Sequence, residues 1–208
     1  RNVLKKSTQF LVPAFVLAFS CSVVAAPHKV RIEDPALAKS LVAQGAKVIA
    51  DYGTFSVLRA DDALLANGIS NRVELADRWN LIRLNARPID TTTPEAKALR
   101  KSAGAFAGKR LHLGQFSGPI KSQWLADLKQ NGVQIVSYIP ENSYLVYGDS
   151  AALARLQTWA SVSDFTQWDG DYTQDLKVHT KARALASRKT DGTFEAADFG
   201  IRLIAHTN

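Results

Sequence analysis

The chain of 208 residues has few of the side chains that metal sites and redox chemistry require. Its single cysteine, Cys21, excludes an internal disulfide and a zinc site built on several thiolates. The four histidines are His28, His112, His179 and His206. None of them has a second histidine or a cysteine at the spacing of a metal site. The sequence therefore predicts neither a metal ion nor another cofactor.

Catalytic motifs are missing as well. No serine stands in the G-x-S-x-G turn of hydrolases, and the glycine-rich stretch 104–108 lacks the lysine of a phosphate loop. Asp61 and Asp62 fit the cap of a short helix better than a catalytic carboxylate pair. His112 lies in a predicted strand, where a structural role is favoured over that of a base. The sequence thus predicts no catalytic residue and leaves open whether a longer parent protein is an enzyme.

Positive charge is present but not concentrated. The formal net charge is +7, and lysine and arginine are scattered along the chain rather than gathered in a stripe. The segment 143–147 has aromatic residues that suit base stacking, as in RNA-binding domains of split β-α-β fold, but no lysine or arginine lies within it. We therefore expect no nucleic-acid partner.

Residues 1–26 have the pattern of an export signal. Arg1, Lys5 and Lys6 precede the apolar run Phe10–Phe19, and Val24, Ala25 and Ala26 offer small side chains for cleavage. The run is about half as long as the roughly 20 residues of a bilayer span, so we expect cleavage and no stable membrane span. Lipid attachment at Cys21 is a less favoured alternative, because the bulky Phe19 stands where small residues are expected. The protein is predicted to be secreted or periplasmic.

Residues 27–85 predict strands and helices in the order β-α-β-β-α-β. Asp34 and Pro35 mark a helix start, and Gly45 marks its end. The predicted elements are the strand His28–Ile32, a helix from Pro35 up to Gly45, the strands Lys47–Ala50 and Thr54–Leu58, the helix Ala63–Ala66, and one or two strands within Arg72–Leu84 around Trp79. The last part is the least regular, which indicates a degenerate module.

Residues 110–169 repeat this order more clearly, after a linker at 86–109 that includes a possible helix, Pro94–Ala103. Ser122 and Asp149 are predicted helix caps, and Gly132 a helix end. The predicted elements are the strand Leu111–Phe116, a helix after Ser122, the strands Val133–Tyr138 and Tyr144–Tyr147, the helix Ala151–Trp159 and the strand Val162–Trp168.

An internal repeat relates the two regions. Aligning the helix-ending Gly45 with Gly132 brings several further positions together. It pairs Val48 with Ile135, Ile49 with Val136, Phe55 with Tyr144, Val57 with Val146, Asp61 with Asp149, Ala63 with Ala151 and Leu65 with Leu153. The shared glycine and capping aspartate favour duplication over chance likeness.

These patterns predict an α+β protein with two tandem ferredoxin-like modules, each a four-stranded antiparallel sheet with both helices on one face. Residues 170–208 form a tail whose segment Phe199–Ala205 is a predicted strand without a partner. The sequence contains no methionine, even at position 1. We therefore expect an alternative start codon or a fragment, in which case the tail strand begins a following domain.

The second predicted sheet is apolar on both faces, since neither 133–138 nor 144–147 alternates cleanly with polar residues. We expect its helix-free face to be covered by the first repeat, by a following domain or by another protein. The candidate residues of a partner-docking sheet are Phe116, Val136, Tyr138, Tyr144, Leu145, Val146 and Tyr147.

The stretch 111–172 also carries a more specific pattern. It reads L-x-x-F-x-G-P-I, then W-x-x-x-L, then G-x-x-I-x-x-Y-I-P-x-N-x-Y-L-V, and ends on Trp168, Gly170 and Tyr172. The residues that match are Leu113, Phe116, Gly118, Pro119, Ile120, Trp124, Leu128, Gly132, Ile135, Tyr138, Ile139, Pro140, Asn142, Tyr144, Leu145 and Val146. This pattern resembles the N-terminal region of large secreted bacterial subtilisin-like serine peptidases.

The resemblance implies a role. Subtilisin propeptides are split β-α-β domains whose sheet docks on the peptidase, assists its folding and blocks its cleft until removal. The chain has no catalytic triad motifs, so no catalytic residue carries over, and the tail that enters the cleft is not recognisable. The resemblance thus implies an exported inhibitor or folding assistant from a truncated precursor, with a subtilisin-like peptidase domain as partner in cis or in trans. A secreted binding or scaffold module unrelated to proteolysis is the alternative.

Overall fold

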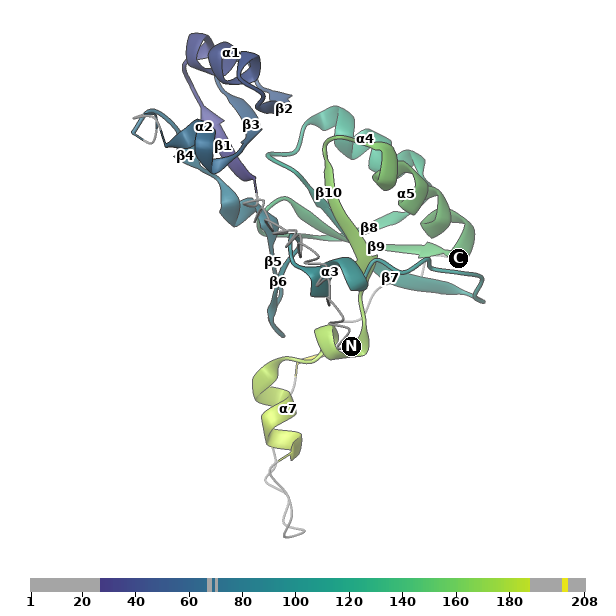
Figure 1. The fold of residues 1–208 in the computed structure, drawn as a ribbon. Coiled ribbons are helices and arrows are strands. Elements are labelled where there is room, and N and C mark those ends of the chain that lie inside the picture. The colour runs from purple at the N-terminus through teal and green to yellow at the C-terminus, as the bar shows by residue number, and fades with distance from the viewer. Residues whose placement is uncertain (1–26, 67–68, 70, 188–199, 202–208) are drawn as a thin grey trace, which may run out of the picture.

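The computed structural model describes residues 27–66, 69, 71–187 and 200–201. The predicted leader with Cys21, and most of the predicted strand Phe199–Ala205, lie outside the described residues. Two α+β modules are joined by a connector, and each contains one four-stranded antiparallel sheet (Figure 1). The α+β class predicted from the sequence is therefore confirmed.

The first module follows the predicted order of elements. It consists of β1 (His28–Ile32), α1 (Pro35–Ala43), β2 (Lys47–Asp51), β3 (Ser56–Ala60), α2 (Asp62–Leu65) and β4 (Glu74–Leu75). The strands lie in the order β2-β3-β1-β4, and all neighbours are antiparallel. The Asp34 carboxylate accepts hydrogen bonds from the N–H groups of Ala36 (2.9 Å) and Leu37 (3.2 Å), as predicted for a cap. Gly45 follows α1 with φ of +113°, a conformation that favours glycine.

The helix α1 covers one face of this sheet. Val30 and Ile32 of β1 pack against Leu37 and Leu41 of α1, together with Leu58 of β3. Each of these side chains is at most 7 % exposed, so each contributes roughly 1.5–3 kcal/mol through burial. The other helix, α2, has one turn, and its predicted cap Asp61 makes no side-chain hydrogen bond to the helix.

The connector, residues 76–108, holds short elements of its own. They are the 3-10 helix η1 (Asp77–Asn80), β5 (Leu81–Arg83), β6 (Pro88–Asp90) and α3 (Pro94–Ala98). The strands β5 and β6 pair as a separate two-stranded sheet. Two short strands, β4 and β5, lie on either side of Trp79, as predicted for 72–84, while Trp79 itself lies in the 3-10 helix. The predicted linker 86–109 contains the possible helix, shortened to Pro94–Ala98, and also the strand β6. The helix α3 begins at a capping Thr93, whose hydroxyl accepts from Ala96 N–H (3.2 Å).

The second module repeats the arrangement on a larger scale. It consists of β7 (Lys109–Phe116), α4 (Ser122–Gln130), β8 (Gln134–Ile139), β9 (Ser143–Asp149), α5 (Ser150–Val162) and β10 (Thr166–Asp171). The strand order is β10-β7-β9-β8, again with antiparallel neighbours. Asp149 caps α5 through Ala152 N–H (2.8 Å), as predicted. Ser122 is the first residue of α4 and not its cap, because Lys121 occupies the cap position.

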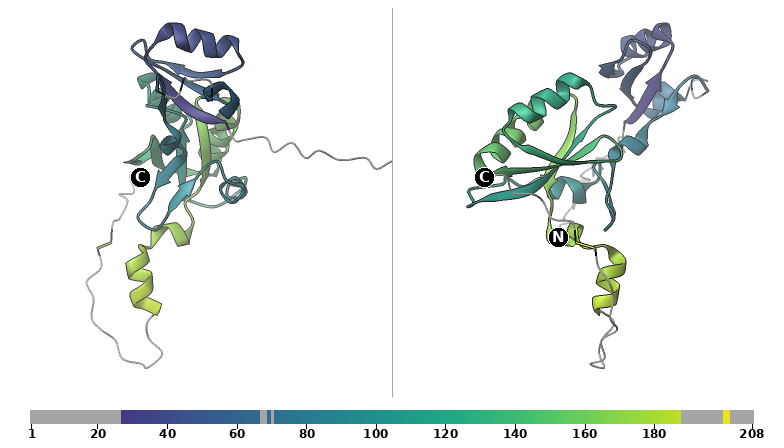
Figure 2. Two further views of the ribbon diagram at one scale, coloured as in Figure 1. Left: turned by 60° about the vertical axis from the view of Figure 1, so that its left-hand side comes forward. Right: turned by 180° about the vertical axis from the view of Figure 1, so that it is seen from behind.

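Both helices of the second module lie on one face of its sheet (Figure 2). Phe116 and Val146 of the sheet pack there against Leu128 of α4 and against Leu153 and Leu156 of α5. After β10 the chain continues into α6 (Gln174–Lys177) and α7 (Thr180–Ser187). Within the described ranges, no helix has the length and apolar character needed to cross a membrane.

The two sheets support the predicted repeat and correct its register. Both have an irregularity at the aligned residues Ile49 and Val136, where one strand carries an extra residue. Val48 lies opposite Leu58, and its counterpart Ile135 lies opposite Val146. Leu58, and not Val57, is therefore the equivalent of Val146. The predicted alignment is off by one position there, and in a strand one position changes the face.

The modules touch through the β2–β3 turn and the start of α4. The Tyr52 hydroxyl donates a hydrogen bond to the Pro119 carbonyl (2.6 Å), and the Lys121 ammonium donates to the Asp51 carbonyl. Ala50, only 6 % exposed, belongs to the same buried cluster as Trp124 of the second module. The segment Gly118–Lys121 therefore holds the second module against the first.

Candidate docking site

The predicted docking residues do not share one surface. Phe116, Tyr144 and Val146 face the helices of the second module, and Phe116 and Val146 are at most 3 % exposed. Both side chains lie in the core, so neither can belong to an exposed docking surface. This corrects the prediction, which took both faces of the sheet as candidates.

The helix-free face of the second sheet is covered from within the chain. Leu113 and Trp168 of the sheet pack against Ile82 of β5, Ile89 of β6 and Leu176 of α6, and Leu145 joins the same cluster. Trp168 is 1 % exposed, and its indole N–H donates to the Ala96 carbonyl of α3 (2.9 Å). The cover is thus the connector and the tail. Within it, β5 falls in residues 27–85, which the sequence assigned to the first repeat, whereas β6 and α3 fall in the predicted linker and α6 in the predicted tail.

Polar contacts fix this cover in place. The Gln115 amide donates to the carbonyls of Leu81 and Glu141, both at 3.1 Å, and its oxygen accepts from the Thr91 hydroxyl (2.8 Å).

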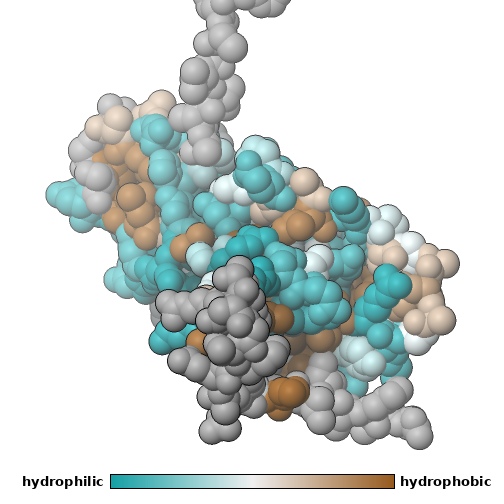
Figure 3. Space-filling model, turned by 90° about the horizontal axis from the view of Figure 1, so that it is seen from below, coloured by the Kyte–Doolittle hydropathy of each residue, from teal (hydrophilic) through white to brown (hydrophobic). Residues whose placement is uncertain are grey.

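On the side seen from below, hydrophobic residues lie in separate patches between polar ones (Figure 3). No broad apolar area is visible among the described residues on that side.

The edge strand β8 remains open. Among the described residues it pairs with β9 alone, and it contains no charged residue or proline. Tyr138 is 54 % exposed, and Val136 lies at the irregular position of the ladder. An edge strand presents unpaired N–H and C=O groups, which natural proteins shield with charges, proline or bulges, and of these devices β8 has only the irregularity at Val136. The β8 edge can therefore accept a further strand.

The turn between β8 and β9 has a defined conformation. Three residues join the strands, and two of them, Glu141 and Asn142, have φ values of +67° and +64°, in the left-handed region that residues other than glycine seldom adopt. Asparagine is one of the residues that tolerates this conformation, which explains Asn142 in the family-like pattern. Arg83 lies 3.5 Å from the carboxylate of Glu141. The turn thus also contacts the connector.

A polar cluster lies beneath α5, at the other edge of the sheet. Arg100 donates to Asp169 from Nη2 (2.7 Å) and Nε (3.2 Å). His112 is fully buried, with Nε2 3.0 Å from Asp169 and Nδ1 3.3 Å from Asp171. Burial raises the pKa of Asp169, but the hydrogen bonds from His112 and Arg100 outweigh it and hold the pKa below its ordinary value. The cluster ties the connector to β7 and β10.

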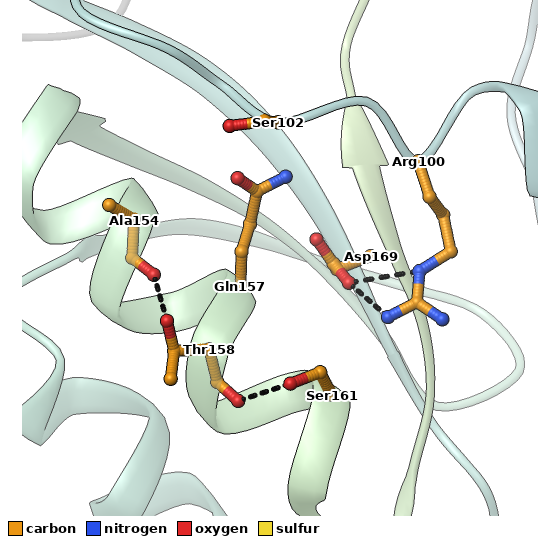
Figure 4. Close-up of a pocket in the computed structure, with 7 residues that line it drawn as sticks. All are labelled: Arg100, Ser102, Ala154, Gln157, Thr158, Ser161 and Asp169. Carbon is orange, nitrogen blue, oxygen red and sulfur yellow. Dashed lines mark hydrogen bonds and ion pairs between the residues drawn. The ribbon is translucent and has the colours of Figure 1, made fainter.

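A polar pocket of about 390 Å³ adjoins this cluster (Figure 4). Its lining residues are Arg100, Ser102, Ala154, Gln157, Thr158, Ser161 and Asp169. The hydroxyls of Thr158 and Ser161 donate to carbonyls of their own helix, at 3.0 and 2.7 Å. Gln157 holds the connector by donating to the Lys101 carbonyl (2.8 Å). Both nitrogens of His112 face carboxylates, so this histidine is not placed to activate a hydroxyl.

The described residues contain no group of three or more histidine, cysteine, aspartate or glutamate side chains placed to hold a metal ion. The sequence indicated His112 as a structural residue, and its buried position fits that interpretation. Nothing in the sequence marked Arg100 or Asp169. Asp169 directly follows the buried Trp168 in β10, and no local sequence pattern at this position indicates an ion pair.

Residues 83–173 match the model of a domain of unknown function, DUF8729. This range runs from the last residue of β5 to the residue that precedes α6, so it joins most of the connector to the whole second module. No curated protein matches the chain. No solved structure matches it.

Proposed function

We propose that the chain is an exported, non-catalytic protein-binding module, similar in role to the propeptide region of a subtilisin-like serine peptidase. Its partner is the peptidase domain, in cis or in trans, which it inhibits or helps to fold. The two modules are proposed to be ferredoxin-like. The β-α-β-β-α-β element order and the strand order of both sheets support this assignment.

The observation that carries the proposal is the open edge of β8. A partner segment in extended conformation can add to this edge as a further strand, with main-chain hydrogen bonds giving affinity. Tyr138 offers an exposed ring beside that edge, and Tyr144 supports it at a centroid distance of 5.5 Å. Of the predicted docking residues, Val136, Tyr138 and Tyr144 thus remain candidates for contact with a partner, whereas Phe116 and Val146 lie in the core.

The family-like pattern is densest in the same place. Ile135, Tyr138 and Ile139 lie in β8, and Asn142 in the turn that follows. Tyr144, Leu145 and Val146 continue the pattern in β9. The part of the chain that resembles a propeptide region therefore coincides with the part that offers an open edge. The leader-like sequence of residues 1–26 supports export to the periplasm or the medium.

An inhibition assay tests the proposal. The full chain is titrated into subtilisin-type peptidases, and hydrolysis of a small peptide substrate is followed. We expect inhibition, and we expect Tyr138→Lys to weaken it about tenfold or more, because a charge on the edge opposes strand addition. Val48→Lys is the matched control, since Val48 is 52 % exposed on β2, the corresponding edge strand of the first module.

Three outcomes are decisive. Inhibition that Tyr138→Lys weakens and Val48→Lys leaves unchanged supports the proposal. Equal loss in both variants contradicts docking at β8. Neither inhibition nor complex formation with any such peptidase contradicts the peptidase partner.

One observation favours a second candidate, a secreted binding or scaffold module unrelated to proteolysis. The resemblance implies docking through the helix-free sheet face, yet in the second module the connector and tail cover this face. The two candidates differ in partner and not in chemistry, so the same assay separates them.

A further inference from the structure

The helix-free face of the first sheet carries a row of positive charges. Arg59 of β3 lies directly opposite Lys29 of β1 on one side and directly opposite Lys47 of β2 on the other. Val30 and Leu58 point toward α1, so these neighbouring side chains point away from it. We call Lys29, Arg59 and Lys47 the basic row. It crosses three adjacent strands.

Two members of the basic row, Arg59 and Lys47, have no ion-pair partner among the described residues, whereas Asp77 lies near Lys29. Like charges directly opposite each other destabilise a sheet. In the described part of the chain, no acidic side chain forms an ion pair with Arg59 or Lys47, whereas the neighbouring Arg31 contacts Glu33 (2.7 Å) and Glu74 (3.3 Å). An anion above Arg59 and Lys47 would relieve this repulsion.

Lys29 makes the arrangement more unusual. It is 2 % exposed, and its ammonium group contacts the Trp79 carbonyl at 3.4 Å. Burial and then the charge of Arg59 lower the pKa of Lys29 to about 7, while Asp77 acts in the opposite direction. A lysine in this position costs stability, which is the kind of strain that functional sites retain.

The surroundings limit the size of the ligand. Glu74 and Asp77 flank the row on the side of β1 and β4, so a long polyanion such as a nucleic acid would meet repulsion there. Beside β3, Phe55 stacks on Tyr52 at a centroid distance of 4.5 Å, and Arg31 lies 4.4 Å from the Phe55 ring. A short peptide segment fits both features if its side chains carry carboxylates on aliphatic chains. It avoids the flanking acidic residues, and its aliphatic carbons can contact the aromatic rings.

We propose that the basic row binds the carboxylates of a short acidic segment of a partner protein. The guanidinium of Arg59 offers a planar fork for one carboxylate, and the exposed ammonium of Lys47 offers a second contact. This site lies on the other module from the β8 edge, and it does not depend on the proposed peptidase partner.

Calorimetric titration of the full chain with a synthetic peptide of alternating glutamate and serine tests this site. We expect Arg59→Gln and Lys47→Gln each to weaken binding about tenfold, as loss of a charge-assisted contact does. Lys39→Gln is the matched control, because Lys39 is an exposed lysine on α1, outside the basic row. The peptide should also bind more tightly than inorganic phosphate titrated in its place.

A second readout uses Lys29. A bound carboxylate favours the charged lysine, so binding above pH 7 should be accompanied by proton uptake, measured in buffers of different ionisation enthalpy. Lys29→Met should abolish the uptake. Binding that Arg59→Gln leaves unchanged, equal weakening by Lys39→Gln, or phosphate binding as tightly as the peptide would each overturn the proposal. So would tighter binding of a single-stranded nucleic acid.

Discussion

The two modules share a strand order and an irregular position in the ladder, but they differ on the face that points away from the helices. The register within each sheet allows the two sheets to be aligned position by position. The first sheet has Lys29, Arg31, Arg59 and Lys47 where the second has Leu111, Leu113, Tyr147 and Gln134. One framework thus carries a charged face and an apolar face.

The difference decides what covers each sheet. The apolar face of the second sheet packs against β5, β6, α3 and α6, because leaving its side chains in water would cost roughly 25 cal/mol per Å². The charged face of the first sheet has a smaller cover, in which Trp79 of η1 packs with Val57 and Ala76. The apolar face is thus buried by neighbouring segments, whereas on the charged face Lys29 is buried and Lys47 stays exposed to solvent.

The largest effect is expected from removing the centre of the cover. Trp168→Ala should lower the free energy of unfolding by about 3–5 kcal/mol, since the side chain is 1 % exposed and the Ala96 carbonyl loses its indole N–H donor. Trp79→Ala, in the thinner cover of the first module, should cost less. Urea unfolding of both variants measures this, and an equal or greater cost for Trp79→Ala would break the comparison.

Lys29 should make the first module sensitive to pH. A lysine whose folded pKa lies near 7 and whose unfolded pKa is near 10.5 destabilises the fold progressively as the pH falls from 10.5 to 7, and by a constant amount below 7. Between pH 9 and pH 7 the loss should be about 2–3 kcal/mol. Lys29→Met should flatten this dependence.

Hydrogen exchange of each module, measured at both pH values, checks this expectation. The second module carries Leu111 at the equivalent position and serves as an internal control. Parallel pH dependence of the two modules in the native chain would contradict it.

Asp169 should give the second module the opposite sensitivity. Its folded pKa is held below the ordinary value, so its stabilisation is present above about pH 4 and is lost as the pH falls through the folded pKa. Asp169→Asn should cost about 2 kcal/mol at pH 7, because Arg100 and His112 lose a charged partner. Thermal unfolding between pH 7 and pH 3 tests this. Asp164→Asn, which changes a carboxylate of the same module outside the cluster, should have little effect.

The smallest effect concerns the two helix-ending glycines. Gly45→Ala and Gly132→Ala should each cost about 1 kcal/mol, since φ is +113° and +83°. A Cβ at Gly45 meets no atom within 4 Å, whereas one at Gly132 lies 2.7 Å from Nη2 of Arg155. The second substitution should therefore cost slightly more. Chemical denaturation measures both, and the reverse order would contradict the comparison.

Local patterns in the sequence predicted most elements of both modules. Asp34, Gly45, Gly132 and Asp149 act as predicted because caps and helix ends depend on a few neighbouring residues. The predicted class, α+β, follows from the same signals. Register was harder, and the alignment missed the equivalence of Leu58 and Val146 because an insertion in a turn can be placed in more than one way.

The cover of the second sheet could not be read from the sequence. Strands β5 and β6 have three residues each, too few for a clear period, and Ile82 meets Ile89 through a pairing that periodicity does not encode. The apolar faces correctly indicated that something lies on the sheet, but not what. The salt bridge of Arg100 with Asp169 joins segments far apart in sequence, and nothing local marks it.

Docking of a peptidase on the β8 edge is the central claim, and amide hydrogen exchange tests it most directly. The full chain is measured alone and with a subtilisin-type peptidase inactivated at its serine. We predict slower exchange in β8, at residues 134–139, and unchanged exchange in the corresponding edge strand β2, at 47–51. Unchanged exchange in β8 in the presence of saturating peptidase would contradict the claim.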